Sequence, residues 1–134
     1  MHSLKNNVVV LTGAGSGIGR ALALQLAARG AKLALSDIDA AALKETSSLL
    51  PHRCEARLYE LDVSRRAAVF AHAEQVRSDF GSVDVVVNNA GVTIIGTVEH
   101  LTIEEIEWQL GINLWGVIYG TKAFLPIMLA QREG

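Results

Sequence analysis

A run of glycines directly after an apolar stretch constrains the fold of this chain more than any other feature. Residues 8–11 are uniformly apolar, as in a strand that is buried on both faces. Glycines at alternate positions follow, and residues 20–29 then have the composition of a strong helix former. Glycines let a backbone approach a ligand closely, and a helix N-terminus presents free N–H groups to an anion. Strand, glycine turn and helix together predict a nucleotide-binding site.

The spacing of the glycines narrows this prediction. The general dinucleotide fingerprint G-x-G-x-x-G does not fit, because its last position falls on Ile18 or Arg20 instead of a glycine. Taken alone, the run could be a flexible loop, but its place between a buried strand and a helix argues against that interpretation. The pattern that fits is T-G-x-x-x-G-x-G, at Thr12, Gly13, Gly17 and Gly19.

Strand and helix patterns alternate along the rest of the chain. We expect strands at 32–36, 57–61 and 83–88, and helices at 40–50 and 103–130. A further helix is expected to have Ser64 as its N-cap, a stripe of Val69, Ala73, Val76 and Phe80, and Gly81 at its end. Helices of this length between strands predict a single α/β domain over 1–134, a Rossmann-type parallel sheet in the order 3-2-1-4. The polar–apolar alternation of 57–61 suits an edge strand.

Composition excludes several classes of partner. The chain has 134 residues, half of them hydrophobic, and a net charge of −2, which gives no electrostatic support for nucleic acid or an anionic membrane. The single cysteine, Cys54, fits a reducing cytoplasm, and we expect no signal peptide and no run of membrane-spanning length. We expect no metal site, because the histidines lack ligand spacing and are interpreted as surface positions: His2, His52, His72 and His100.

Acidic and amide side chains follow the predicted strands. Asp37 ends the second strand, where a carboxylate can accept both hydroxyls of an adenosine ribose and repel a 2′-phosphate, so NAD is favoured over NADP. Asp39 is better explained as a helix cap. Asp62, after the third strand, could accept the adenine amino group or cap a helix, with comparable weight. A turn at 88–91, Asn-Asn-Ala-Gly, follows the fourth strand at the same rim.

The expected long helix at 103–130 opens with a capping box, Thr102-x-x-Glu105, and Pro126 should kink or end it. Asn113 lies on an apolar stripe, so its amide either bonds backbone or holds a catalytic water. One apolar face is expected to lie on the sheet: Ile106, Leu110, Asn113, Leu114, Val117 and Phe124. The opposite face needs further protein, which predicts a homo-oligomer through Trp108, Ile112, Trp115 and Tyr119.

These motifs resemble the short-chain dehydrogenase/reductase family, and the resemblance covers essentially the whole chain. It implies that the glycine turn binds a pyrophosphate, that the Asp37 position sets the choice of cofactor, and that Asp62 contacts the adenine. It also implies that Asn113 is the asparagine of a catalytic tetrad and holds a water in a proton relay. The cofactor residues implied are Thr12, Gly13, Ser16, Gly17, Ile18, Gly19, Asp37, Asp62, Val63, Asn89, Ala90 and Gly91.

The chain departs from the family where the chemistry should occur. That chemistry needs a serine and a tyrosine with a lysine four positions later, but Tyr59 is followed at that distance by Val63 and Tyr119 by Ala123. The sequence stops at Gly134, where the family enters its fifth strand. We therefore expect an NAD-binding, N-terminal portion of an oxidoreductase that acts on an alcohol or carbonyl, truncated after the fourth βα unit and inactive by itself.

Two alternatives remain open. The chain could be a non-catalytic nucleotide-binding or self-associating module, because the fourth strand and the tryptophan face would be uncovered. An S-adenosylmethionine-dependent methyltransferase also uses a glycine-rich first turn and acids after the second and third strands. That class usually has an acid two positions before the first glycine, where this chain has Leu11.

Overall fold

One parallel sheet organises the chain. The computed structural model describes residues 4–134. The strands are β1 (Val8–Thr12), β2 (Lys32–Asp37), β3 (Ala56–Glu60) and β4 (Val85–Val87). They pair in parallel in the order β3-β2-β1-β4, which confirms the predicted fold class and strand order.

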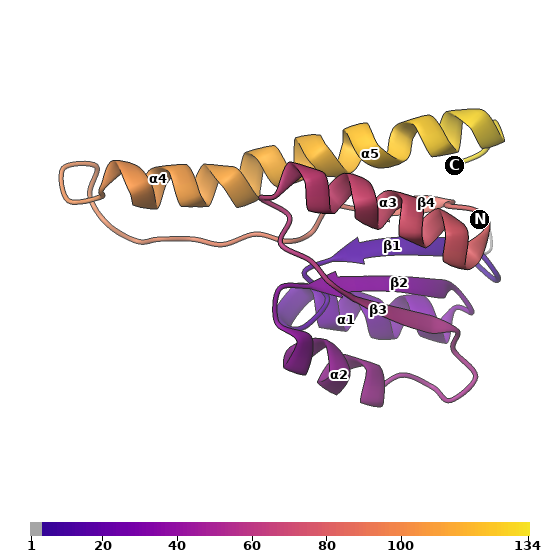
Figure 1. Ribbon diagram of the computed structural model, residues 1–134. Coiled ribbons are helices and arrows are strands. Elements are labelled where there is room, and N and C mark those ends of the chain that lie inside the picture. Colours follow the sequence, from indigo (N-terminus) through magenta and orange to yellow (C-terminus); the bar gives the residue numbers. More distant parts are fainter. Residues whose placement is uncertain (1–3) are drawn as a thin grey trace.

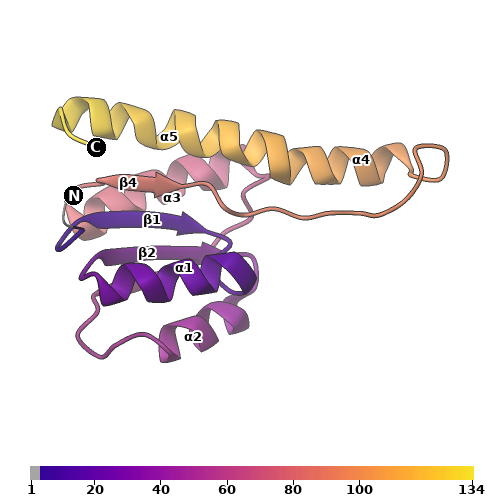
Figure 2. The same cartoon turned by 180° about the vertical axis from the view of Figure 1, so that it is seen from behind.

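Helices cover both faces of this sheet (Figures 1 and 2). Helices α1 (Gly17–Ala28) and α2 (Ala40–Ser48) lie on one face, where Val9, Leu11 and Leu33 pack against them. Helices α3 (Arg66–Phe80) and α5 (Gly116–Gln131) lie on the other, against Val10 and Ala34. Successive side chains of a strand point to opposite faces, so the fully buried β1 supplies both layers of the core.

The outer strands and the boundaries of α2 differ slightly from the expected ranges. Strand β3 is largely exposed, which confirms its place at the edge. Helix α2 ends at Ser48 and β4 covers only Val85–Val87, so both are shorter than expected. Asp39 is the N-cap of α2, and its side chain accepts a hydrogen bond from Ala42 N at 2.9 Å, as predicted.

Helix α3 buries the expected stripe but begins differently. Val69, Ala73 and Val76 are buried, and Gly81 ends the helix with φ +82°. The prediction that Ser64 is the N-cap is wrong, because the N-cap is Arg65. The Ser64 hydroxyl instead donates to Asp62 Oδ1 at 2.6 Å, so a local turn between these two residues precedes the helix.

His72 is not the surface residue that we predicted. It lies on α3 with only 6% of its surface exposed, between the rings of Tyr59 and Phe124 at 4.8 and 5.8 Å. Its position on the helix explains this, since it lies three positions after Val69 and four before Val76, which places all three on one face. His52 and His100 are exposed as expected, and His2 lies outside the described residues.

The long helix consists of three segments. Helix α4 (Ile103–Leu110) projects beyond the sheet, a π-helical turn covers Gly111–Trp115, and α5 continues to Gln131 (Figures 1 and 2). The capping box of Thr102 and Glu105 is present as predicted. Pro126 lies inside α5, so the prediction that it could end the helix is wrong.

The prediction of the two apolar faces of this helix is also partly wrong. Leu110, Leu114 and Val117, expected on the sheet, are exposed, whereas Ile112 and Tyr119, expected to be uncovered, pack against the core. The π-helical turn rotates the residues that follow it, so a constant 100° per residue fails here. The buried stripe also contains small residues that carry no hydrophobic signal: Gly116, Gly120 and Ala123.

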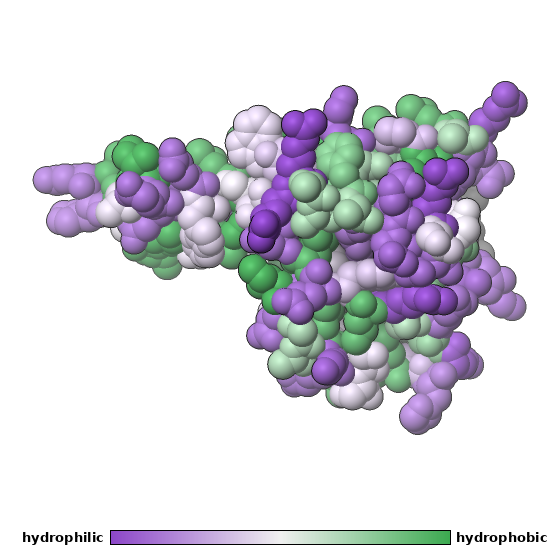
Figure 3. Space-filling model, viewed as in Figure 1, coloured by the Kyte–Doolittle hydropathy of each residue, from purple (hydrophilic) through white to green (hydrophobic). Residues whose placement is uncertain are grey.

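The long helix contradicts one further expectation. By length and composition alone, Ile103–Gln131 is apolar enough to cross a membrane, although we expected no such run. A helix that packs into a protein core passes the same test, and α5 buries Phe124 and Ile127 against α3 and the sheet. Hydrophobic and hydrophilic side chains alternate over the projecting arm that contains α4 (Figure 3).

Candidate cofactor site

The glycine turn brings β1, α1 and β4 into close contact. Gly13 has φ +67°, and a Cβ there would come within 2.8 Å of Ala90 Cα. A Cβ on Gly19 would collide with the carbonyl oxygen of Gly13. Larger side chains would therefore separate the turn from the segment after β4, which explains why the sequence has glycine at both positions.

The N-terminus of α1 has the features of an anion site. Its N-cap residue, Ser16, makes no side-chain capping bond, and the first turn contains no acidic residue. A Cβ built on Gly17 would meet no atom within 4 Å, so this part of the turn faces open space. The first backbone N–H groups of the helix are thus left for an outside acceptor, and the helix dipole favours a negative one.

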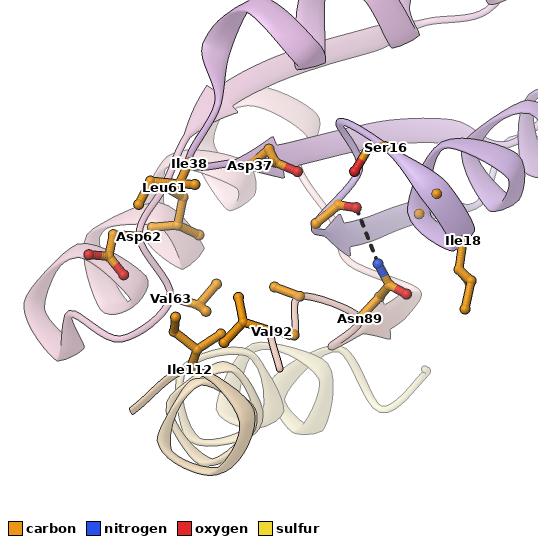
Figure 4. Close-up of a pocket in the computed structure, with 15 residues that line it drawn as sticks. Ser16, Ile18, Asp37, Ile38, Leu61, Asp62, Val63, Asn89, Val92 and Ile112 are labelled. Atoms are coloured by element: carbon orange, nitrogen blue, oxygen red, sulfur yellow. Dashed lines mark hydrogen bonds between the residues drawn. The ribbon is translucent and has the colours of Figure 1, made fainter. Parts of the chain in front are cut away.

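A cleft of about 380 Å³ opens beside this turn, at the carboxyl ends of the strands (Figure 4). Every predicted cofactor residue except Thr12 lines it. The lining residues are Gly13, Ser16, Gly17, Ile18, Gly19, Asp37, Ile38, Leu61, Asp62, Val63, Asn89, Ala90, Gly91, Val92 and Ile112.

Thr12 and Asn89 join the glycine turn to the segment after β4. The Thr12 hydroxyl accepts hydrogen bonds from Asn89 N and Ala90 N, both at 3.0 Å. The Asn89 amide donates in return to the carbonyls of Thr12 at 3.0 Å and Gly13 at 3.2 Å, the second drawn in Figure 4. Thr12 therefore acts behind the cleft, where it fixes two segments that line it.

Asp37 is held by backbone N–H groups on both of its oxygens. Oδ2 accepts from Gly15 N at 2.8 Å and Oδ1 from Asp39 N at 3.0 Å. These bonds fix the carboxylate at the end of β2 and beside the glycine turn. A carboxylate oxygen has more than one acceptor site, so each oxygen can still accept a ligand hydroxyl.

Asp62 does not cap α3, whose N-cap is Arg65, so the helix-cap interpretation of this residue is wrong. Its Oδ1 accepts from Ser64 N at 3.0 Å and from the Ser64 hydroxyl, which stabilises the turn before α3. The residue also lines the cleft, beside Val63 in Figure 4. Its local hydrogen bonds use only Oδ1.

Asn113 lies outside the lining of the cleft and is an exposed residue of the π-helical turn. Its amide forms two bonds with the backbone of Val92: Nδ2 donates to the carbonyl at 2.7 Å, and Oδ1 accepts from the N–H at 2.8 Å. The bond to backbone, one of the two interpretations of its polarity, is therefore present. Asn113 thereby fixes the segment directly after Gly91.

Four lining residues were not predicted. Ile38, Leu61 and Val92 are direct neighbours of predicted site residues, so their position along the chain was a usable signal. Ile112 has no such signal, because its place depends on the π-helical turn that rotates the long helix.

Several titratable groups away from this cleft have shifted pKa values. Burial lowers the pKa of His72 to about 4. Burial and the hydrogen bond to Asp79 raise the pKa of Tyr59, and burial raises the pKa of the Cys54 thiol. The lining of the cleft combines backbone N–H groups, two carboxylates and apolar side chains, which gives it the character of a binding surface.

A family model of short chain dehydrogenases matches residues 7–134. The chain belongs to the short-chain dehydrogenase family. This match decides against the methyltransferase alternative. A relative, a putative oxidoreductase named SadH from Mycobacterium tuberculosis, is 47% identical over 135 residues, which are 100% of this chain and 49% of SadH. The chain thus spans about half the length of the curated relatives that it matches.

Solved short-chain dehydrogenases superimpose closely on the chain. A Burkholderia phymatum enzyme in complex with NAD has a TM-score of 0.95 and 40% identity, and the match covers 100% of this chain and 48% of that one. A metagenomic short-chain oxidoreductase in complex with NADP has a TM-score of 0.92 and 33% identity, with 99% and 61% covered. Both nicotinamide dinucleotides thus occur among the structural neighbours.

Proposed function

We propose that this chain is the NAD-binding portion of an oxidoreductase that interconverts an alcohol and a carbonyl compound. The observation that carries the proposal is the cleft itself. An uncapped helix N-terminus, a fixed carboxylate at the end of β2 and the turn after β4 line one continuous surface. The nicotinamide ring of the dinucleotide, when bound, supplies the site that gives or takes the hydride.

The residues of the chain would each bind a different part of the dinucleotide. The N–H groups at the start of α1 would donate to the pyrophosphate, and Asp37 would accept from the ribose hydroxyls of the adenosine. Asp62 and Val63 would contact the adenine. Asn89, Ala90 and Gly91 would support the cofactor where it leaves the glycine turn, with Thr12 and Asn113 fixing that segment from behind.

The preference for NAD over NADP rests on Asp37. Its carboxylate is fixed by two backbone N–H groups, so it cannot turn away from a 2′-phosphate without losing both bonds. Two negative charges at hydrogen-bond distance repel strongly where water is partly excluded. Ile38, the next residue, offers no positive charge to offset this repulsion.

Calorimetric titration with NAD and NADP tests this proposal. The chain should bind NAD more tightly than NADP. Asp37→Asn should weaken the binding of NAD and reduce the difference between the two affinities. Asp39→Asn is the matched control, because Asp39 caps α2 two residues away and should leave both affinities within about twofold. Equal affinities for the two dinucleotides in the unmodified chain would overturn the preference, and an absence of saturable binding would overturn the site.

We further propose that the chain does not catalyse hydride transfer by itself. Neither tyrosine is placed for proton transfer at the cleft: the Tyr59 hydroxyl donates to Asp79 at 2.7 Å, and the Tyr119 ring stacks on Trp115. Neither has a lysine four positions later. Turnover with NAD over a broad panel of alcohols should be undetectable. Cofactor-dependent oxidation that persists in Asn113→Ala would contradict this proposal.

A second candidate role is self-association through the long helix. Trp108 and Trp115 are 49% and 48% exposed, and Leu110 and Leu114 lie close to them along the helix with similar exposure. Large apolar side chains exposed along one helix are typical of a protein interface. We propose that a second copy of the chain covers the helix at Trp108 and Trp115. Ile112 and Tyr119, which belong to the core, are not part of this surface.

Analytical ultracentrifugation at micromolar concentration tests the second role. The chain should sediment as a dimer or a larger species, and Trp115→Glu should shift it toward monomer. Leu49→Glu is a matched control, because Leu49 is equally exposed but lies at the end of α2, away from the long helix. A stable monomer of the unmodified chain would exclude self-association without affecting the cofactor site.

A further inference from the structure

Both backbone polar groups of Gly15, in the glycine turn, are held by side chains. The N–H of Gly15 donates to Asp37 Oδ2 at 2.8 Å, and its carbonyl accepts from Arg20 Nη2 at 2.6 Å. A Cβ on Gly15 would come within 2.9 Å of both Ala42 Cβ and Asp37 Oδ2, so this residue also packs tightly. The position of Gly15 and the orientation of the Asp37 carboxylate are therefore coupled.

Thr46 completes this arrangement from α2. Its side chain is fully buried, with 0% of the residue exposed. Its hydroxyl lies 2.9 Å from the carbonyl oxygen of Ala14 and 3.2 Å from that of Gly15, and accepts from Arg20 Nε at 3.0 Å. A buried hydroxyl with partners on every side fixes the backbone that it contacts.

Glu45 holds the remaining part of the arginine. Its two oxygens accept from Arg20 Nη1 and Nη2, both at 3.0 Å, in a bidentate pair. Glu45 is largely exposed, so this pair contributes little to folding stability. Its effect is geometric, because the planar guanidinium is directed at the Gly15 carbonyl and kept from other acceptors.

We propose that Arg20, Glu45 and Thr46 are positioning residues that set the discrimination between NAD and NADP. They fix the carbonyls of Ala14 and Gly15, which flank the Gly15 N–H that orients Asp37 toward the ribose. The inference rests on the proposed function, since it needs Asp37 to bind a ribose. It extends that function to side chains that do not line the cleft.

Thr46→Val is the direct test, because valine preserves the shape and removes the hydroxyl. We expect the Kd for NAD to rise about fivefold and the Kd for NADP to change less than twofold. The preference for NAD, expressed as the Kd for NADP divided by the Kd for NAD, therefore falls. Thr46→Ser restores the hydroxyl and should bring the ratio back within twofold of the unmodified chain. Equal weakening of both dinucleotides, or no change in either, would overturn the inference.

Arg20→Met provides a second test that separates positioning from charge. The loss of a nearby cation would by itself weaken NADP more than NAD, since NADP has the additional phosphate. A positioning role predicts the opposite, namely that the affinity for NAD falls more than the affinity for NADP. Arg29→Met, at the other end of α1, is the matched control and should leave the ratio unchanged.

Failure of this inference and failure of the proposed function give different results. If the unmodified chain binds neither dinucleotide, the proposed function is wrong, and if it binds both equally, the preference assigned to Asp37 is wrong. If it binds NAD more tightly, and Thr46→Val and Arg20→Met leave the ratio of the two affinities unchanged or lower the affinity for NADP more, only the positioning role is wrong. Urea unfolding of each variant establishes that the titrated protein is folded.

Discussion

His72 should make the stability of this fold depend on pH between 7 and 5. The ring is 6% exposed, and its Nε2 has no hydrogen-bond partner among the described residues. Burial lowers its pKa from 6.5 to about 4. Above pH 6.5 the ring is neutral in both the folded and the unfolded chain. Below that value the unfolded chain binds a proton that the folded chain excludes, so stability falls until the pH reaches about 4.

The size of this effect follows from the two pKa values. One pKa unit corresponds to about 1.4 kcal/mol, and at pH 5 the unfolded form of His72 is mostly protonated while the folded form is mostly neutral. The free energy of unfolding should therefore fall by about 2 kcal/mol between pH 7 and pH 5 from this group alone. The hydrogen bond from Tyr59 lowers the pKa of Asp79 from 3.8, so that carboxyl stays largely ionised over this range.

Urea unfolding followed by far-UV circular dichroism at the two pH values measures the difference. In His72→Phe the ring contacts with Tyr59 and Phe124 can persist, and any packing cost is the same at both pH values. Between pH 7 and pH 5, the free energy of unfolding of this variant should fall by about 2 kcal/mol less than that of the unmodified chain. His52→Gln, an exposed histidine, should behave as the unmodified chain does. Equal losses in His72→Phe and the unmodified chain would refute the reasoning.

Three further substitutions test the packing and the backbone bonds. Phe124→Ala removes a side chain that is 2% exposed and should cost about 3–5 kcal/mol in urea unfolding; a loss below 1 kcal/mol would show that the site is not core. Thr12→Val leaves Asn89 N and Ala90 N without their acceptor and should cost about 1–3 kcal/mol, while Thr12→Ser should not. Gln131→Leu removes the amide that bonds Val83 N and O at 2.9 Å, and hydrogen exchange at Val83 should quicken; unchanged exchange would contradict that role.

The N-terminal half of the fold and most of the cleft could be predicted because the signals there are local. Buried parallel strands are uniformly apolar, and the turn from β1 into α1 admits only glycine at Gly13 and Gly19. Ligands bind at the carboxyl ends of parallel strands, so residues directly after a strand are natural candidates. Asp37 and Asn89 were therefore predicted correctly as lining residues, because each lies at or just after the carboxyl end of an apolar strand.

The long helix could not be predicted in the same way. Its faces depend on a π-helical turn at Gly111–Trp115, which a pattern with constant rotation does not contain. Its buried face is built partly from Gly116 and Gly120, where close approach to Val63 and Asn88 replaces side-chain hydrophobicity. The same limit explains why Ile112 was missing from the predicted site.

Contacts between segments that are distant in the sequence could not be predicted from local patterns either. Arg20 and Thr46 are far apart in the sequence and meet only because α1 and α2 pack on the same face of the sheet. His72 carried a usable signal in its spacing from Val69 and Val76. A histidine is so often exposed that its residue type outweighed its position.

An NMR titration of the 15N-labelled chain with NAD tests the central claim most directly. Saturable shifts should occur at the amides of Gly17, Ile18, Asp37 and Gly91, which line the cleft. The amides of Gly30 and Cys54, near the opposite ends of the strands, should stay unchanged. Shifts confined to Gly30 and Cys54, or no saturable shift at all, would contradict the assignment of this cleft as a dinucleotide site.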